Sequence, residues 1–271
     1  MSEPPQATLH TLINADGSVT YSAPNHGYQI AAGVNYPVEV PYRSDEIPES
    51  TFIEVNLRPH DGVGMVKERH VEELIKRTLQ TIVLGEETPR TMLQVTLQVV
   101  SVETDGSLPG GAKSGGQAET YLDILASAIN ASVLGCLDAG VQMKAVAGAT
   151  LIGIGPDEEV IVEPGVLQRK KCSSLHVFGF TSNGKTVLME SEGKSTISSW
   201  KQAEQAARSA ILGHIDYSTN VSDVNKQNGD VAMNGTSTKG NTASNSVICV
   251  LDVMRKAMEA RVIKDESWRQ D

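Results

Sequence analysis

The sequence predicts an α/β protein with a single core. Two observations support this class. Segments with the two-residue period of a strand alternate with segments of helical period. Two low-complexity stretches leave roughly two hundred residues, enough for a single core. Aromatic residues make up only 4% of the chain, so we expect an aliphatic core.

The first half of the chain reads as strands interrupted by one helix. Val71, Leu74, Ile75, Leu79 and Ile82 recur at helical spacing and predict an amphipathic helix over residues 69–84. Apolar and polar residues alternate over 93–99, which predicts a half-buried strand. The other strands expected here cover residues 17–20 and 28–34, which form an opening hairpin, and then 36–40 and 52–57.

The second half continues the alternation. Residues 104–118 form a loop rich in Gly, Ser and Ala, and a helix that is apolar nearly all round follows at 122–137. Asn183-Gly184 predicts a tight hairpin turn. The remaining expected elements are strands at 145–154, 160–162, 175–181 and 186–189, and helices at 200–212 and 247–262.

These elements divide the chain into four parts. Residues 1–14 are expected to be a flexible N-terminus, and residues 15–214 a single domain that carries the insertion at 104–118. Residues 215–245 are dominated by Asn, Ser, Thr, Gly and Asp, a composition typical of disorder. Residues 246–271 are expected to form a C-terminal helix and tail.

Composition excludes several function classes. The formal charge of −10 argues against an isolated nucleic-acid binder, and the few aromatics argue against a single-strand binder with stacking platforms. The three cysteines lack a Cys-x-x-Cys spacing and predict reduced thiols in a cytosolic or nuclear protein. The six histidines show no zinc-ligand pairing, so no metal is expected. No signal peptide or membrane span is expected either.

The segment 119–140 carries the most informative motif. Its second half contains Ala128-Ile129-Asn130-Ala131 and then Asp138-Ala139-Gly140. This pattern resembles the second helix of the RNase PH family of phosphorolytic exoribonucleases. In active members that helix opens with a Gly-Thr-Arg turn, which binds phosphate. Counted back from Asp138, the turn falls on Asp123, Ile124 and Leu125, so the resemblance implies a degenerate phosphate site.

The physical chemistry of these three residues agrees with that loss. A helix N-terminus attracts anions through free N–H groups, and an arginine in the first turn adds a bidentate phosphate contact. Here Leu125 occupies the arginine position and Asp123 introduces a carboxylate. A like-charge pair at ~4 Å costs on the order of 4 kcal/mol at an effective dielectric of ~20. Thr120 and Asp123 also read as a capping box that would satisfy the helix start internally.

The resemblance implies a second degenerate element. Active members carry two aspartates after a Val-Ile-Val strand, one directly after it and one six residues on. Carried over from residues 160–162, these positions are expected at Pro164 and Lys170, neither of which can act as a metal ligand or general acid in the family's manner. The nearby acidic residues are interpreted as a solvated turn: Asp157, Glu158, Glu159 and Glu163.

Basic residues provide the candidates for RNA contact. In this family the start of the first helix lines the RNA path of an assembled ring, which points to four residues here: Lys67, Arg69, Lys76 and Arg77. Interleaved glutamates also fit an ordinary charged helix face. The run Arg169-Lys170-Lys171 could contact a phosphate or a neighbouring subunit, and a solvated loop is the alternative.

The resemblance extends over about residues 17–212 and is greatest to non-catalytic RNase PH-like ring subunits of the eukaryotic RNA exosome. It implies an α+β fold, in which mixed β-sheets pack against helices in a β-α-β-α unit. It also implies an inactive subunit, a pseudoenzyme without a cofactor. Its implied partners are other RNase PH-like ring subunits, S1/KH-type cap subunits, a separate nuclease subunit and single-stranded RNA in the channel. It further implies a role in rRNA processing and RNA degradation, and a location in the nucleus, nucleolus and cytoplasm.

Two other functions stay open from the sequence. One is an active phosphorolytic or metal-dependent exoribonuclease that uses displaced acidic residues. The other is an acidic protein–protein scaffold that never contacts RNA.

Overall fold

The computed structural model of the protein describes residues 4–24, 28–102, 120–213 and 249–269. Its strands form a five-stranded sheet in the order β1-β2-β3-β5-β4 and a four-stranded sheet in the order β7-β6-β8-β9. The strands are β1 (Gln6–Leu9), β2 (Gly17–Ser22), β3 (Gln29–Glu39), β4 (Phe52–Arg58), β5 (Thr91–Ser101), β6 (Ala147–Ile154), β7 (Val160–Val162), β8 (Ser174–Thr181) and β9 (Thr186–Gly193).

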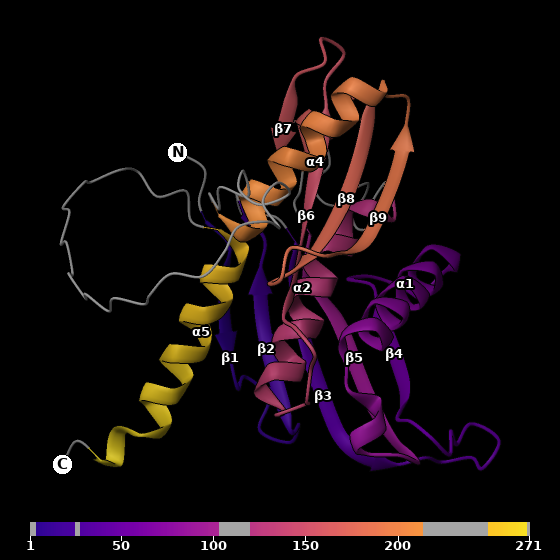
Figure 1. The fold of residues 1–271 in the computed structure, drawn as a ribbon, viewed down its shortest axis with the longest axis vertical. Helices are drawn as coiled ribbons and strands as arrows, with labels where there is room; N and C mark the ends of the chain where they lie inside the picture. The colour runs from indigo at the N-terminus through magenta and orange to yellow at the C-terminus, as the bar shows by residue number, and fades with distance from the viewer. Residues whose placement is uncertain (1–3, 25–27, 103–119, 214–248, 270–271) are drawn as a thin grey trace, which may run out of the picture.

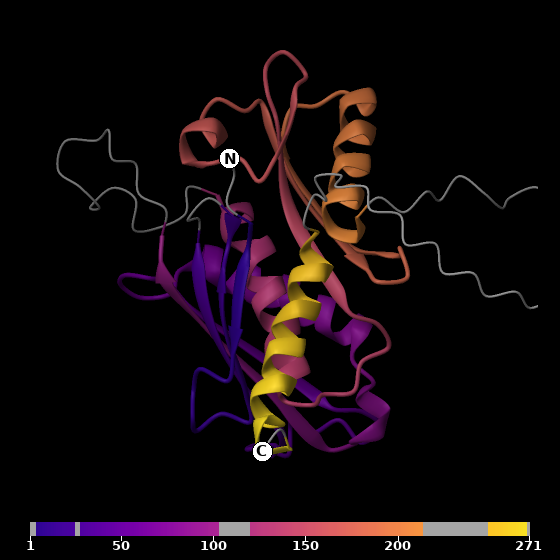
Figure 2. The same ribbon diagram turned by 90° about the vertical axis from the view of Figure 1, so that its left-hand side faces the viewer.

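Helices separate and cover the two sheets (Figure 1). Helix α2 contacts strands of both sheets, α1 packs on β4 and α2, and α4 packs on β6, β7 and β8. Figure 2 shows the last helix, α5, running along the side of the molecule that carries β1. The helices are α1 (Val66–Ile82), α2 (Leu122–Asp138), α3 (Val166–Arg169), α4 (Ile197–Leu212) and α5 (Val250–Asp265), with short 3₁₀ turns η2 (Gly85–Glu87) and η3 (Ser267–Arg269).

The central position of α2 explains its sequence. Every residue from Leu122 to Cys136 is buried, because the helix lies between two sheets and has no solvent-facing side. The motif residue Asn130 connects the layers. Its amide nitrogen donates to the Ala149 carbonyl at 2.8 Å and to the Tyr21 hydroxyl at 3.1 Å, while its oxygen accepts from the Ala149 N–H at 2.8 Å. The motif therefore serves packing, with its buried polar group fully bonded.

Most of the predicted elements are confirmed. Strands β2 and β3 form the expected antiparallel pair, and β8 and β9 are joined by the expected turn at Gly184, which has a positive φ of 75°. The expectation of a separate strand at 36–40 was wrong. Strand β3 continues through this region, with a register shift between Asn35 and Val38 where Tyr36-Pro37 interrupts the pairing with β5.

The expectation of a flexible N-terminus was wrong for residues 6–9. These residues form β1, which pairs with β2 over four positions from Gln6↔Ser22 to Leu9↔Val19. A four-residue strand has too short an alternation to stand out in a sequence, and its partner strand supplies its hydrogen bonds. The expected insertion at 104–118 and the low-complexity segment at 215–245 lie outside the described residues. No helix in the described part of the chain has the length and apolarity needed to cross a membrane.

Candidate functional site

The candidate phosphate turn lies at the start of α2, in the interior of the molecule. Ile124 is 7% exposed and Leu125 is completely buried, so both residues belong to the hydrophobic core. The side chain of Asp123 is 5% exposed. The position that would present an arginine to phosphate therefore contributes an aliphatic side chain to the core.

The predicted capping box at this helix start is only half present. The Thr120 N–H donates to Asp123 Oδ2 at 3.3 Å, and the Asp123 N–H bonds to the Thr120 carbonyl at 3.4 Å. The Thr120 hydroxyl is buried without a hydrogen-bond partner among the described residues. The helix begins one residue later than the box requires, with Tyr121 as its N-cap in an α-helical conformation.

The second degenerate element needs a correction of one residue. Strand β7 ends at Val162, which pairs with Ile152, so the residue directly after the strand is Glu163 and not Pro164. Glu163 turns the chain with a φ of 49°, and its N–H donates to the Leu151 carbonyl at 2.8 Å. Six residues on is Arg169, not Lys170. The two acidic positions of the family pattern thus carry one carboxylate and one guanidinium.

Arg169 connects both degenerate elements. Its Nη1 lies 3.7 Å from Asp123 Oδ1, its Nε donates to the Pro164 carbonyl at 2.7 Å, and its guanidinium carbon is 5.5 Å from the centre of the Tyr28 ring. Its side chain is only 12% exposed. Because the guanidinium is occupied by a buried carboxylate and a carbonyl, Arg169 is a poor candidate for RNA contact, contrary to expectation.

Glu163 lies beside this pair and is also engaged. The Thr150 hydroxyl donates to Glu163 Oε1 at 2.7 Å, and the Leu151 N–H donates to the same oxygen at 3.1 Å. Burial raises the pKa of Glu163, while these two hydrogen bonds and the charge of Arg169 act in the opposite direction. The carboxylate is held against β6 and is not presented to a ligand.

The opposite side of the helix start is closed by Tyr121. Its ring meets the His70 ring edge-on at a centroid distance of 4.8 Å, and its hydroxyl donates to Glu190 Oε2 at 3.4 Å. Burial raises the pKa of Tyr121, and the negative charges of Glu190 and Glu192 raise it further. An anion that approached from this side would meet an aromatic ring and two carboxylates.

The charges at the described start of α2 are therefore arranged against an incoming anion. Arg169 is paired with Asp123 at the helix start, and the nearby carboxylates repel a phosphate. Among residues 4–24, 28–102, 120–213 and 249–269, no group of three or more His, Cys, Asp or Glu side chains is placed to hold a metal ion.

The four RNA-contact candidates of α1 lie on its outer side, where most have partners within or beside the helix. Arg69 pairs with Glu72 at 3.2 Å and Arg77 with Glu73 at 3.0 Å, while the Lys76 ammonium lies 5.1 Å from the Phe52 ring centre. This matches an ordinary charged helix face. Lys67 is exposed, as are Lys170 and Lys171 after α3.

Two functional features were missed from the sequence. The Asp123–Arg169 pair joins residues far apart in the chain. The contacts of Tyr121 with His70 and Glu190 depend on α1 and β9 meeting at the start of α2. The strand end at Val162 was the available signal for the first feature, because counting from it reaches Arg169. No local signal predicted the second.

Comparison with known proteins agrees with this architecture. Residues 4–142 match the RNase PH family model, described as 3′ exoribonuclease family, domain 1. The chain is 28% identical over 195 residues to Exosome complex component RRP46 of Saccharomyces cerevisiae, covering 69% of this chain and 81% of the relative. It is 28% identical over 214 residues to the Exosome complex exonuclease RRP46 homolog of Oryza sativa, covering 79% of this chain and 81% of the relative.

Solved structures give the same answer for the fold. The crystal structure of rice Rrp46 matches with a TM-score of 0.63 and 26% identity, covering 77% of this chain and 88% of that one. A chain of an archaeal exosome core matches with a TM-score of 0.57 at 12% identity, which shows a shared fold. The fold, with its two sheets and central α2, agrees with the match to the family model. The chain belongs to the RNase PH family of 3′ exoribonucleases.

Proposed function

We propose that this protein is a structural, catalytically inactive subunit of an RNA exosome core ring, in the place of an RRP46-type component. The observation that supports catalytic inactivity is the buried Asp123–Arg169 pair, which lies where the phosphate turn is expected. The assignment to the exosome is supported by two relatives: the yeast protein is named an exosome complex component, and the rice protein is named an exosome complex exonuclease.

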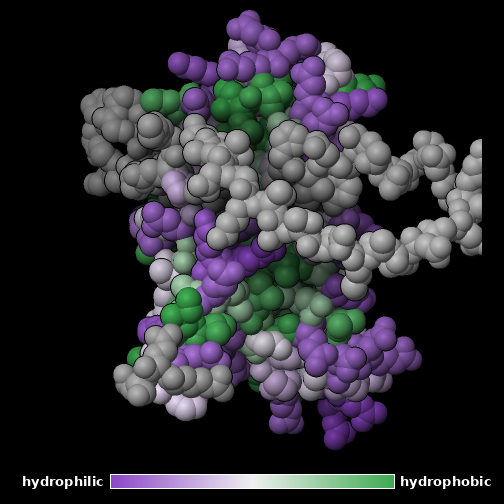
Figure 3. Space-filling view, turned by 60° about the vertical axis from the view of Figure 1, so that its left-hand side comes forward, coloured by the Kyte–Doolittle hydropathy of each residue, from purple (hydrophilic) through white to green (hydrophobic). Residues whose placement is uncertain are grey.

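The surface is also suited to assembly. Figure 3 shows apolar surface at the upper end and in the lower half of one face. Exposed apolar patches commonly mark protein–protein contact sites. Large apolar side chains more than half exposed include Ile13, Val63, Met65, Val66, Leu167 and Ile197. Neighbouring ring subunits, cap subunits and a nuclease subunit are the proposed partners.

The first test asks whether the chain alone degrades RNA. Purified protein is incubated with end-labelled RNA, inorganic phosphate and Mg²⁺, beside an active phosphorolytic enzyme as a positive control. We expect no nucleoside diphosphates. Release of diphosphates that Glu163→Gln abolishes, while the exposed Glu159→Gln and Asp157→Asn do not, would establish the alternative of an active exoribonuclease, as would metal-dependent release of monophosphates.

The second test asks whether the chain assembles. Its melting temperature is measured alone and with the other ring subunits from the same organism. A ligand that binds only the folded state raises that temperature by mass action. We expect an increase with ring partners and none with an unrelated acidic protein. If no ring subunit changes the melting temperature, the assignment to the exosome ring is contradicted, whatever the outcome of the activity assay.

Contact with RNA is proposed for the assembled ring alone. Lys67, Lys170 and Lys171 are the exposed candidates. Crosslinking of single-stranded RNA to the assembled ring distinguishes RNA channelling from a pure scaffold, with Lys67→Ala and Lys170→Ala as the variants that should reduce it. A tagged chain is proposed to localise to the nucleus, nucleolus and cytoplasm together with the other subunits.

A further inference from the structure

Helix α5 connects the two sheets of the fold. It contacts β1 of the five-stranded sheet, β6 of the four-stranded sheet, and α4. Both ribbon views show it running beside β1 (Figures 1 and 2). Its buried residues are Val250, Val253, Met254 and Ala257. All four lie in the first half of the helix, so the second half depends on a different contact.

The first half of α5 packs closely on β6. A Cβ at Gly148 of β6 would lie 3.3 Å from Val250 Cγ1 and 3.5 Å from Leu251 Cδ2, so a larger residue there would disturb this contact. Cys249, the N-cap residue of α5, is 3% exposed. Because its thiol is covered while the helix is docked, Cys249 reports whether this end of α5 is in place.

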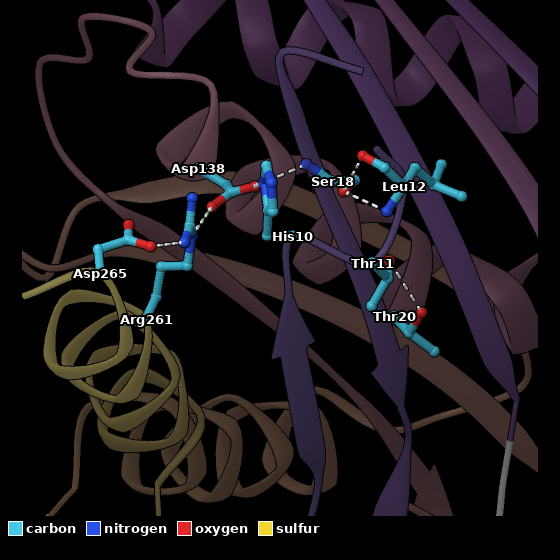
Figure 4. Close-up of polar contacts among 8 residues, drawn as sticks. All are labelled: His10, Thr11, Leu12, Ser18, Thr20, Asp138, Arg261 and Asp265. Carbon is cyan, nitrogen blue, oxygen red and sulfur yellow. Dashed lines mark hydrogen bonds and ion pairs between the residues drawn. The ribbon is translucent and has the colours of Figure 1, made fainter. Parts of the chain in front are cut away.

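A buried ion pair holds the second half of α5 (Figure 4). Arg261 Nε lies 3.3 Å from Asp138 Oδ1 at the end of α2, and the Asp138 side chain is 3% exposed. The other carboxylate oxygen accepts the Ser18 N–H at 2.8 Å and lies 3.9 Å from His10 Nδ1. Asp138 therefore joins α2, the turn between β1 and β2, and α5.

Both members of this pair have a second partner. Arg261 also pairs with Asp265 on its own helix, and Asp138 also holds the Ser18 N–H. Breaking a buried ion pair is costly mainly when it leaves a charge without compensation. If α5 leaves, the guanidinium keeps Asp265 and the carboxylate keeps its hydrogen bond. Separation of Arg261 from Asp138 therefore costs less than the separation of an isolated buried pair.

Strand β1 depends on the same contacts. It is the outermost strand of its sheet, so β2 is its strand partner on one side and α5 packs against it. The His10 N–H donates to the Ser18 carbonyl at 2.7 Å, and the Leu12 N–H donates to the Ser18 hydroxyl at 2.9 Å. Loss of α5 would leave β1 with its bonds to β2 and less packing around them.

The rest of the core does not need α5. Val250 and Met254 are the α5 residues buried in the main hydrophobic cluster, whose other buried members lie between Val19 and Leu212 in the sequence. These other members come from the two sheets, α1, α2 and α4. The core therefore keeps nearly all of its apolar contacts when α5 is removed from it.

We propose that α5 is a releasable strap and that the Arg261–Asp138 pair is its latch. Opening the latch frees the whole helix, including the first turn at Cys249, and loosens β1. The two sheets and the helices α1, α2 and α4 stay packed. This inference does not rest on the exosome assignment.

The three cysteines of the full-length chain provide the test. A pulse of N-ethylmaleimide is followed by peptide mass spectrometry, which gives the labelling rate of each thiol. In the unmodified chain we expect Cys249 to react at least roughly tenfold faster than Cys136, which is buried in α2, because release of the strap needs less than global unfolding. Cys172 is partly exposed and shows that the reagent is active.

Arg261→Glu opens the latch, because a glutamate beside Asp138 and Asp265 repels where Arg261 attracted. We expect Cys249 to react about tenfold faster than in the unmodified chain, with Cys136 unchanged. Arg261 lies roughly 18 Å along the helix from Cys249, at ~1.5 Å per residue, so a faster reaction reports release of the whole helix. Asp138→Asn keeps an oxygen for the Ser18 N–H and should act in the same direction from the other side of the pair.

Hydrogen exchange tests the effect on β1. In Arg261→Glu we expect the His10 amide to exchange about tenfold faster than in the unmodified chain. The Thr51 amide donates to the Gly85 carbonyl at 2.9 Å beside β4, at the opposite edge of the same sheet, and should not change. Arg255→Glu makes the same charge change at an exposed position of α5 and should alter neither readout.

Three outcomes overturn the proposal. The first is that Arg261→Glu and Asp138→Asn both leave the reaction of Cys249 unchanged, because the pair would then not hold the helix. The second is that Cys136 and Cys249 accelerate together, because α5 would then leave only when the core unfolds. The third is a faster Cys249 with unchanged exchange at His10, because β1 would then be independent of the strap.

Discussion

Arg169 at the end of α3 reaches back to Asp123 in the first turn of α2, and the two charges meet 3.7 Å apart in the interior. Each comes from a segment where the family pattern implies catalytic chemistry. The arginine stands where an acidic residue is implied, and the carboxylate stands in the phosphate turn. Their pairing joins these two segments, which are far apart in the sequence, in one buried contact.

Removal of Arg169 should destabilise the protein strongly. Arg169→Ala leaves the Asp123 carboxylate buried without its counter-charge, which costs about 3 kcal/mol. Urea unfolding measures the loss. Arg77→Ala, which removes an exposed pair with Glu73, is the control and should cost less than about 1 kcal/mol. Adding Asp123→Asn to Arg169→Ala should recover part of the stability. A double variant no more stable than Arg169→Ala would show that the pair contributes no charge coupling.

His176 should make the protein sensitive to mild acid. It is buried on β8 between the hydroxyls of Ser174 and Ser191, at 2.9 Å and 2.8 Å, and burial lowers its pKa. Below the unfolded value of about 6.5 the unfolded state therefore binds the proton more readily. The contribution to stability is present above that pH and is lost as the pH falls through the folded pKa.

The measurement is the urea midpoint at about pH 7.5 and about pH 5.5. His176→Gln keeps a hydrogen-bonding side chain without the titration, so its midpoint should fall less on acidification than that of the unmodified chain. Equal losses in the two proteins would assign the acid sensitivity to other groups. Glu163 is not such a group: burial raises its pKa, so the folded state binds the proton more readily and the effect of Glu163 on acidification has the opposite sign.

Gly17→Ala should destabilise the contact between β2 and the end of α2. A Cβ on Gly17 would lie 2.3 Å from the Ala139 nitrogen and 2.5 Å from the Gly135 oxygen, which are backbone atoms that cannot rotate away. We expect a loss of about 1–3 kcal/mol in urea unfolding. At Gly64 the nearest atom is 3.9 Å away, so Gly64→Ala should change stability by less than about 0.5 kcal/mol. Equal effects at both positions would contradict the packing argument.

The segment between α4 and α5 should be dispensable for folding. A Cβ on Gly213 would lie 3.7 Å from Cys249 Sγ, so the two ends of residues 214–248 are already neighbours. Replacing residues 216–245 with a short Gly-Ser linker should leave the melting temperature nearly unchanged, since the composition favours disorder. A large decrease would mean that this segment contributes to the packed fold.

The sequence by itself determined the elements whose pattern is local. The apolar spacing of residues 69–84, the alternation of 93–99 and the apolar run from residue 122 predicted α1, β5 and the buried α2, because periodicity reports which side of an element meets the core. The motif around Asn130 and Asp138 pointed to the family, and in the fold these two side chains join α2 to strands β6 and β2.

Only the tertiary structure decided which distant groups meet. Three contacts join elements whose pairing no local sequence pattern identifies. Asp123 pairs with Arg169, Tyr121 contacts both His70 and Glu190, and Arg261 pairs with Asp138. A charged side chain has many candidate partners in a sequence. Topology brings one of them within bonding distance, and burial then makes that one contact costly to break.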